Sequence, residues 1–301
     1  MSSSYVPLLM KDEEPRNWAE LPSELTSFIL NRLSMIDILE NVQKVCKPWR
    51  RVCKDLSMWR KIDMSNLGDF ATKYDLMIMC RHAVDLSQGG LVDIDIWDFG
   101  TDDLLYYIAE RSINLRSLRF AYNKITDEGV MKAVVKLPLL EELDVILYCS
   151  LSGNSMRVVG QSCPNLKTLR LNHSPKVEYF GCDESNSIAT EIAECMPKLR
   201  HLQLIGDGLN NTGLNAILDG CPYLDHLDLR ECSNINLVGD LEKKCSKRIS
   251  VLRCPYDSTA DLPFQTTLYD LEWDFVSDCG FDNDVDFEFS CTSPSDYYRW
   301  Y

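Results

Sequence analysis

A short apolar pattern, leucine-x-x-leucine-x-leucine, recurs along most of the chain and limits what it can fold into. Successive copies begin 24, 25, 26, 33, 25 and 25 residues apart. Repeats of this length cannot bury an apolar face alone, so they stack on one another, as in leucine-rich-repeat solenoids. The copies are Leu91/Ile94/Ile96, Leu115/Leu118/Phe120, Leu140/Leu143/Val145, Leu166/Leu169/Leu171, Leu199/Leu202/Leu204, Leu224/Leu227/Leu229 and a weak Ile249/Leu252/Cys254.

Each copy predicts a strand that buries its template residues and exposes the residues between them. Helical stretches such as 126–136 and 212–219 lie between the strands. The sequence therefore predicts an α/β solenoid of about seven or eight repeats, with parallel strands inside and helices outside. A further opening copy is expected at Trp59/Ile62/Met64. A stack of independent αβ units without repeat character is the alternative.

Several helical stretches end in a Cys-Pro-like break, in which the proline prevents the helix from continuing. We expect the cysteines near these breaks to be reduced and buried, as small apolar residues in a reducing compartment. They are Cys163, Cys195, Cys221 and Cys245. The long spacing of 33 residues places an insertion within 172–187, which predicts a surface loop that is either idle or part of a binding face.

The segment 18–59 does not follow the repeat and predicts three short helices. Pro22 suits a first helical position, Ser34 with Asp37 forms a capping pair, and Pro48 can begin a third helix. A unit of this size seldom supplies its own core, so surplus apolar surface is expected to dock on another body. The apolar residues are Leu25, Phe28, Ile29, Leu30, Leu33, Ile36, Ile38, Leu39, Val42, Val45, Trp49, Val52 and Leu56.

This segment resembles the F-box, a three-helix module that binds the Skp adaptor of cullin-based ubiquitin ligases. The matching positions are Leu21-Pro22, Glu24-Leu25, Ile29-Leu30, Leu33, Asp37, Val45-Cys46-Lys47, Trp49-Arg50 and Trp59. The resemblance, together with the apolar surplus, implies an adaptor-binding surface formed by Leu21, Pro22, Leu25, Ile29, Leu30, Leu33, Val45 and Trp49. A plain helical cap on the repeats is the alternative.

Residues 15–262 together resemble plant Skp-interacting F-box/leucine-rich-repeat proteins. The phrases at 79–85 and 137–143 add to the resemblance. We expect a disordered start at 1–16, an F-box at 17–62, repeats at 63–254 and an acidic aromatic tail at 255–301. The family resemblance implies a location in the nucleus and/or cytoplasm.

The charge of −15 is unevenly distributed, with −10 in residues 255–301 and +3 in residues 17–62. The acidity argues against a nucleic-acid surface, and no apolar run is long enough to span a membrane. The tail alternates acids with aromatics, which predicts disorder. Alternatively, Trp273 and Phe275 fold back over the solenoid end, so we expect partial order at 255–275 and mobility at 276–301.

The sequence contains none of the phosphate-loop, zinc-protease or serine-elbow motifs, so we expect no catalytic residues, cofactor or metal. His201 and His226 share one exposed strand position, where polar binding residues are favoured over a metal-binding or pH-sensing pair. The exposed strand positions carry both signs of charge, which suits a protein partner. The predicted substrate-binding residues are Arg119, Glu142, Asp144, Arg170, His201, His226, Asp228 and Arg253.

The sequence thus predicts a non-catalytic substrate receptor, in which the F-box holds the adaptor and the repeats hold a protein for ubiquitination. A binding or inhibitory solenoid that does not act through a ubiquitin ligase is the second hypothesis. An enzyme is the third, and it lacks a nucleophile–base pair.

Overall fold

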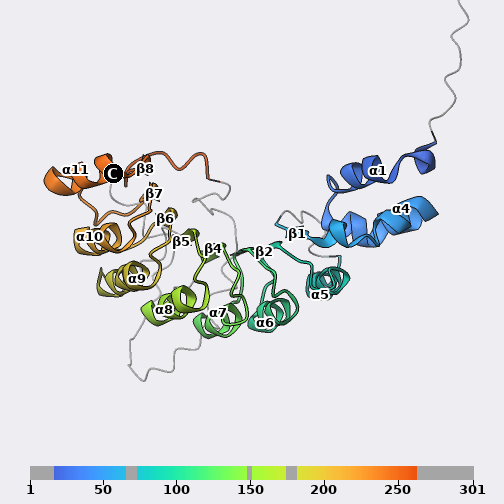
Figure 1. The fold of residues 1–301 in the computed structure, drawn as a ribbon, viewed down its shortest axis with the longest axis horizontal. Helices are drawn as coiled ribbons and strands as arrows, with labels where there is room; N and C mark the ends of the chain where they lie inside the picture. The colour runs from blue at the N-terminus through green and yellow to red at the C-terminus, as the bar shows by residue number, and fades with distance from the viewer. Residues whose placement is uncertain (1–16, 66–72, 148–150, 174–181, 263–301) are drawn as a thin grey trace, which may run out of the picture. The chain divides into compact units, whose positions relative to one another are not determined.

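The computed structural model describes residues 17–65, 73–147, 151–173 and 182–262. Within these ranges eight parallel strands form one sheet in sequence order, and Figure 1 shows helices α5 to α11 following one another along one side of it. The predicted α/β solenoid is therefore confirmed. The strands are β1 Lys61–Met64, β2 Asp93–Trp97, β3 Ser117–Ala121, β4 Glu142–Leu147, β5 Thr168–His173, β6 His201–Ile205, β7 His226–Asp228 and β8 Val251–Arg253.

One helix precedes each strand from β2 onward. These helices are α5 Leu76–Leu86, α6 Asp102–Arg111, α7 Asp127–Val134, α8 Gly153–Ser162, α9 Cys182–Cys195, α10 Asn211–Gly220 and α11 Gly239–Arg248. None of the helices in the described part of the chain is long and apolar enough to cross a membrane.

The N-terminal module contains three main helical segments. Its elements are η1 Trp18–Glu20, α1 Ser23–Leu30, a continuous run of α2 Met35–Asp37, η2 Ile38–Val42 and α3 Gln43–Val45, then α4 Lys47–Val52 and η3 Leu56–Trp59. The Ser34 side chain accepts a hydrogen bond from the Asp37 N–H at 3.1 Å, which confirms the predicted cap. Pro48 lies in the first turn of α4, as predicted, whereas Pro22 is the N-cap of α1 rather than its first helical residue.

The core is a ladder of template residues in register across the strands. Ile62, Ile94, Leu118, Leu143, Leu169, Leu202, Leu227 and Leu252 occupy equivalent positions on β1 to β8. All of them except Leu252 are fully buried, and Leu252 lies on β8, which pairs only with β7 among the described strands. Trp59, Ile62 and Met64 are buried as well, which confirms the opening copy.

Buried cysteines close several helices against the preceding repeat. Cys163, Cys221 and Cys245 are at most 1% exposed, and the Cys163 thiol lies 3.5 Å from the Leu137 carbonyl oxygen. Burial raises the pKa of Cys163 to about 12 and that of Cys221 to about 11, so both are unreactive thiols. The nine cysteines whose side chains the structure describes are free.

The prediction for Cys195 is wrong, because this residue is only half-buried. Met196 takes the buried position instead. The Met196 N–H bonds to the Ile192 carbonyl, as the Cys163 N–H bonds to Val159 in the preceding repeat. Met196, rather than Cys195, is therefore the residue equivalent to Cys163 in this repeat.

Side chains at the start of α6 and α7 connect neighbouring repeats. Asp102, the first residue of α6, accepts hydrogen bonds from the Thr126 N–H and hydroxyl, both at 2.7 Å. Thr126 in turn caps α7, whose first residue, Asp127, binds the Ser152 N–H and hydroxyl at 2.9 and 2.8 Å. Ser152 then caps α8. We refer to Asp102, Thr126, Asp127 and Ser152 as the capping relay.

Several predictions fall on segments only partly described. Residues 182–187 of the expected insertion loop form the first turns of α9, and 174–181 lie outside the described residues. At the C-terminal end, 255–262 are described and Pro255 is buried. The predictions for 1–16 and for the tail beyond Leu262 also lie outside the described residues.

Close packing between helices generates a test of the solenoid. A methyl group added at Gly220, the last residue of α10, would overlap the backbone of Ala193 in α9. We expect Gly220→Ala to lower the free energy of unfolding by about 1–3 kcal/mol, the usual cost of overpacking. Urea denaturation followed by circular dichroism measures the change.

The neighbouring Asp219→Ala variant is the control, since this side chain is 71% exposed and its ion pair with Lys244 lies at the surface. We expect it to change stability by at most about 1 kcal/mol. Equal stability of the Gly220 variant and the wild type would contradict the helix packing described here.

Candidate functional site

Several large apolar side chains of the N-terminal module are exposed to solvent. Leu25, Phe28 and Leu33, in and just after α1, are 52%, 59% and 40% exposed, and Val45 at the end of α3 is 59% exposed. We refer to these four residues as the exposed apolar set. Apolar groups concentrated on one small module are typical of a surface that docks on a partner.

The structure separates the predicted adaptor-binding residues into three groups. Leu25, Leu33, Val45 and Pro22 are exposed, whereas Leu21, Ile29 and Trp49 are half-buried. Leu30 is fully buried, so its assignment to a docking surface is wrong. It lies one helical turn after Thr26, and these two form the inward stripe of α1.

Two further residues belong with this surface. Phe28 was counted in the apolar surplus but not among the docking residues, and the Arg32 guanidinium lies 4.5 Å from its ring centroid. Trp18 is 59% exposed, and its carbonyl accepts a hydrogen bond from the Trp49 indole N–H at 3.3 Å. Trp49 therefore holds η1 against α4.

The open face of the sheet carries a row of alternating charges that the strand register aligns. Asp95, Arg119, Asp144 and Arg170 occupy equivalent positions on β2 to β5, and we refer to them as the charge ladder. Arg119 lies between two carboxylates, with Nη1 2.9 Å from Asp95 Oδ2 and Nε 2.9 Å from Asp144 Oδ2. Arg170 reaches the same Asp144 oxygen at 3.5 Å.

The two carboxylates of the charge ladder are not exposed, contrary to the prediction. Asp95 and Asp144 are each 7% exposed, because the neighbouring arginines cover them and the Trp97 indole donates to Asp95 at 2.7 Å. Burial raises the pKa of both carboxyls, and the charge of Arg119 opposes this rise. Asp144 Oδ1 has no hydrogen-bond partner among the described residues.

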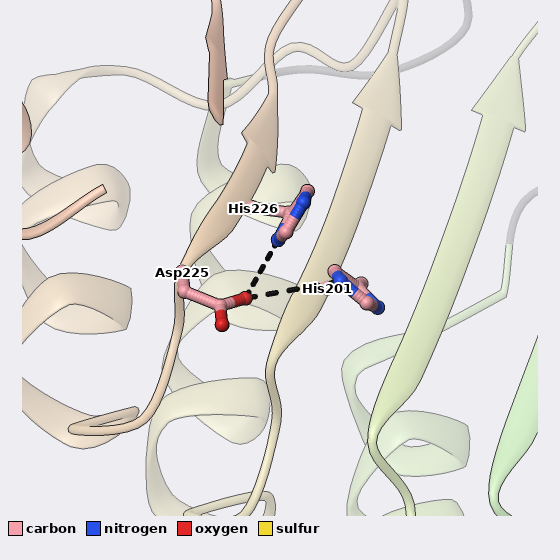
Figure 2. Close-up of side chains that lie close together, drawn as sticks. All are labelled: His201, Asp225 and His226. Carbon is pink, nitrogen blue, oxygen red and sulfur yellow. Dashed lines mark hydrogen bonds and ion pairs between the residues drawn. The ribbon is translucent and has the colours of Figure 1, made fainter. Parts of the chain in front are cut away.

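A second row of the sheet face runs through Glu142, Thr168, His201 and His226. Glu142 is exposed as predicted, whereas Thr168 is buried. The two imidazole rings meet edge to face, with centroids 4.1 Å apart. Asp225 lies beside them, as Figure 2 shows, with Oδ1 2.7 Å from His226 Nδ1 and 3.8 Å from His201 Nε2. The alternation of buried and exposed residues along the strands does not predict a role for Asp225, because this residue precedes β7.

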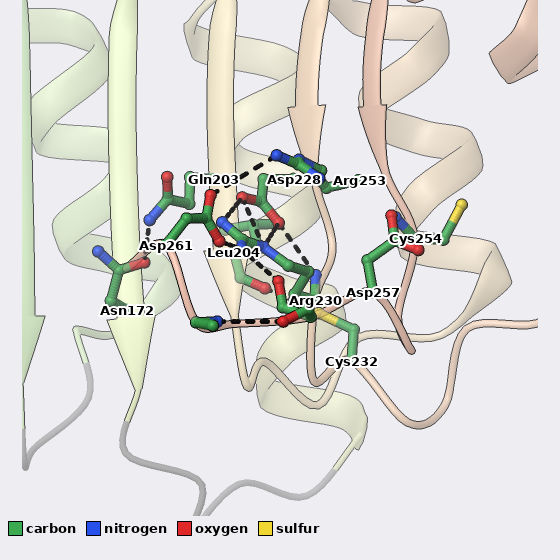
Figure 3. A network of polar contacts seen from close by, with 12 residues as sticks. Asn172, Gln203, Leu204, Asp228, Arg230, Cys232, Arg253, Cys254, Asp257 and Asp261 are labelled. Carbon is green, nitrogen blue, oxygen red and sulfur yellow. Dashed lines mark hydrogen bonds and ion pairs between the residues drawn. The ribbon is translucent and has the colours of Figure 1, made fainter. Parts of the chain in front are cut away.

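The last strands are joined to the segment after them by a buried arginine. The Arg230 side chain is 3% exposed and binds Asp228, Asp261 and the carbonyl of Ser258 (Figure 3). Asp228, predicted to bind substrate, is therefore held by Arg230, with Nη2 2.7 Å from Oδ2. Arg253 remains 48% exposed and lies 3.6 Å from Asp261. The strand pattern in the sequence does not point to Arg230, because this residue follows β7 and lies outside its alternation of buried and exposed positions.

The charge ladder leads to a pH-dependent prediction. Arg119→Gln leaves Asp95 and Asp144 buried without their shared cation, so we expect a loss of about 1–3 kcal/mol at pH 7. A carboxyl group whose pKa is higher in the folded state than in the unfolded state stabilises the fold when it is protonated. The loss should therefore be smallest below the ordinary value of 3.8 and grow as the pH rises toward the folded pKa. Urea denaturation across this pH range measures it.

Arg116→Gln is the matched control, because Arg116 pairs with Glu141 but is 53% exposed. We expect it to lower stability by at most about 1 kcal/mol. An Arg119→Gln loss that does not change with pH would show that the buried carboxylates are not the cause.

Comparisons with known proteins match both parts of this geometry. The family model described as F-box-like matches residues 18–65, and the model described as Leucine Rich repeat matches residues 111–132. A solved structure, "Crystal structure of Rad7 and Elc1 complex in yeast", has a TM-score of 0.44 and 15% identity, covering 66% of this chain and 58% of that one. This similarity is too weak to support a functional assignment.

Two curated relatives from Arabidopsis thaliana are much more similar. "Putative F-box/LRR-repeat protein 23" is 63% identical over 86% of this chain, and the chain spans 58% of that relative's length. "F-box protein SKIP19" is 59% identical over 95% of this chain and 93% of its own length. With an F-box-like module, a leucine-rich-repeat sheet and relatives at this identity, the chain belongs to the plant F-box/leucine-rich-repeat protein family.

Proposed function

We propose that the protein is the substrate-recognition subunit of a Skp–cullin–F-box ubiquitin ligase. The observation that carries this proposal is the exposed apolar set on a module that matches the F-box model. Each such side chain contributes about 1.5–3 kcal/mol when fully buried, so four of them can support a specific interface after association costs. The net +3 of residues 17–62 favours an acidic Skp-family adaptor, and through it a cullin.

The open face of the sheet is the proposed binding surface for a protein to be ubiquitinated. Glu142 and Arg253 are exposed, so both signs of charge remain available beside the self-paired ladder. In this proposal the chain performs no chemistry itself. It holds a target lysine near the ubiquitin carrier and thereby raises the effective concentration of the reacting groups. The proposed location is the nucleus and/or cytoplasm.

A binding or inhibitory scaffold independent of a ligase is the second candidate. The burial of Leu30 and the half-burial of Ile29 and Trp49 favour it, because a module that only caps the repeats would turn these residues inward. The exposed apolar set favours the receptor, since a module that only caps the repeats gains no stability from large apolar side chains that face solvent.

A double variant separates the two candidates. Leu25→Glu with Leu33→Glu places charges on the exposed apolar set, so we expect capture of a purified Skp-family adaptor to fall at least 100-fold. The fold should remain intact by circular dichroism, because both side chains are at least 40% exposed. Ile113→Glu is the matched control, since Ile113 is 61% exposed but lies among the repeats. Equal capture by the double variant and the control would refute adaptor docking.

The ligase role predicts a second outcome in cells. Affinity purification with the proteasome inhibited should recover target proteins with the wild type, and these should be depleted without the inhibitor. With the Leu25/Leu33 double variant, the same targets should be recovered equally with and without the inhibitor, because the chain still binds but no longer delivers them. If proteasome inhibition changes the recovery of targets with neither the wild type nor the double variant, the scaffold is favoured.

A further inference from the structure

Two histidines and an aspartate converge at the start of β6 and β7, on the open face of the sheet. His201 and His226 are paired in the strand register, and Asp225 precedes His226 (Figure 2). One potential ligand atom from each of the three lies within 4.8 Å of the others. The side chains are 43%, 44% and 39% exposed for His201, His226 and Asp225, so an ion from solution can reach them.

The surroundings provide a hydrogen-bond partner for one nitrogen of His201. Its Nδ1 lies 3.3 Å from the hydroxyl oxygen of Thr168, which is 3% exposed. When Nδ1–H donates to this oxygen, Nε2 carries the lone pair and faces Asp225 at 3.8 Å. A metal-binding histidine usually donates its other N–H to a neighbouring oxygen in this way. Thr168 is therefore suited to hold the ring for coordination.

The two separations from the Asp225 carboxylate are close to those around a small tetrahedral ion. Zinc binds imidazole nitrogen and carboxylate oxygen at about 2.0–2.2 Å, which places tetrahedral ligand atoms about 3.4 Å apart. The separations of Asp225 Oδ1 from His226 Nδ1 and from His201 Nε2, 2.7 and 3.8 Å, lie on either side of this value. Shifts of less than 1 Å in these partly exposed side chains would bring both separations to it.

We propose that His201, Asp225 and His226 form a binding site for a divalent transition-metal ion, zinc in particular. Imidazole nitrogen suits zinc and other late first-row ions, whereas calcium and magnesium prefer oxygen ligands. His226 Nδ1 and Asp225 Oδ1 already lie 2.7 Å apart, and a bound ion takes the place of any proton between them. Three protein ligands leave the fourth position to water on the solvent side, so the site is open rather than closed.

The position of the site sets it apart from the adaptor surface. It lies on β6 and β7, whereas the exposed apolar set lies between residues 25 and 45. The inference therefore stands or falls independently of the proposed ligase role. It adds a metal-dependent element to the face on which we place substrate binding.

Isothermal titration of the full chain with zinc chloride tests the site directly. We expect one ion per chain, with at least 10-fold weaker binding in both His201→Asn and His226→Asn. His82→Asn is the matched control, because His82 is exposed on α5 and should leave the affinity unchanged. Thr168→Val removes only the oxygen beside His201 Nδ1, and we expect a loss of about 10-fold. Unchanged affinity in either sheet-face histidine variant would overturn the proposal.

Two measurements on the wild type distinguish this site from the cysteines and from misfolded variants. Nitrogen-15 spectra of the imidazoles should show zinc-dependent shifts at His201 Nε2 and His226 Nδ1, with His82 unaffected. Bound cobalt should show no sulfur-to-metal charge-transfer band, since none of the three ligands contains sulfur. A sulfur band at one equivalent of cobalt, or the absence of histidine shifts with zinc, would assign the ion elsewhere and contradict the inference.

Discussion

Each strand of this protein depends on the strand of the next repeat. A single repeat can neither pair the backbone N–H and C=O groups of its strand nor bury its apolar side chains. The row from Ile62 to Leu227 is buried only because eight strands pair in register. The ends of such a stack need separate protection. Trp59 and the N-terminal module cover one end. After the last strand, Arg230 holds the following segment through Asp261 and the Ser258 carbonyl.

The same register that builds the core also organises the charges of the open face. Because equivalent positions lie about 4.8 Å apart, Asp95, Arg119, Asp144 and Arg170 pair with one another and their charges cancel. The middle of the face is thus internally paired rather than a set of free charges. Recognition of a protein partner then falls to residues beside it, such as Glu142 and Arg253, whose side chains remain in water.

The strands, their order and the three-helix module follow from the sequence, since apolar periodicity reports directly on which residues face a core. The burial of the residues between the template positions does not follow from the sequence, because it depends on neighbours about 25 residues away. Asp144 is covered by Arg119 and Arg170, which no local pattern reveals. The error at Cys195 has a similar origin, since two adjacent apolar residues, Cys195 and Met196, were equally suitable for one buried position. The strand pattern does not point to Asp225 and Arg230, because both lie just outside β7 and neither belongs to its alternation of buried and exposed residues.

The capping relay has an evolutionary consequence. Asp102 and Asp127 present the same acceptors, and Thr126 and Ser152 present the same donors, so the joint between one repeat and the next is nearly identical at successive steps. A gene duplication or deletion that adds or removes one whole repeat between such joints leaves complementary surfaces on both sides. Whole repeats can therefore be added or removed at these joints without a new core.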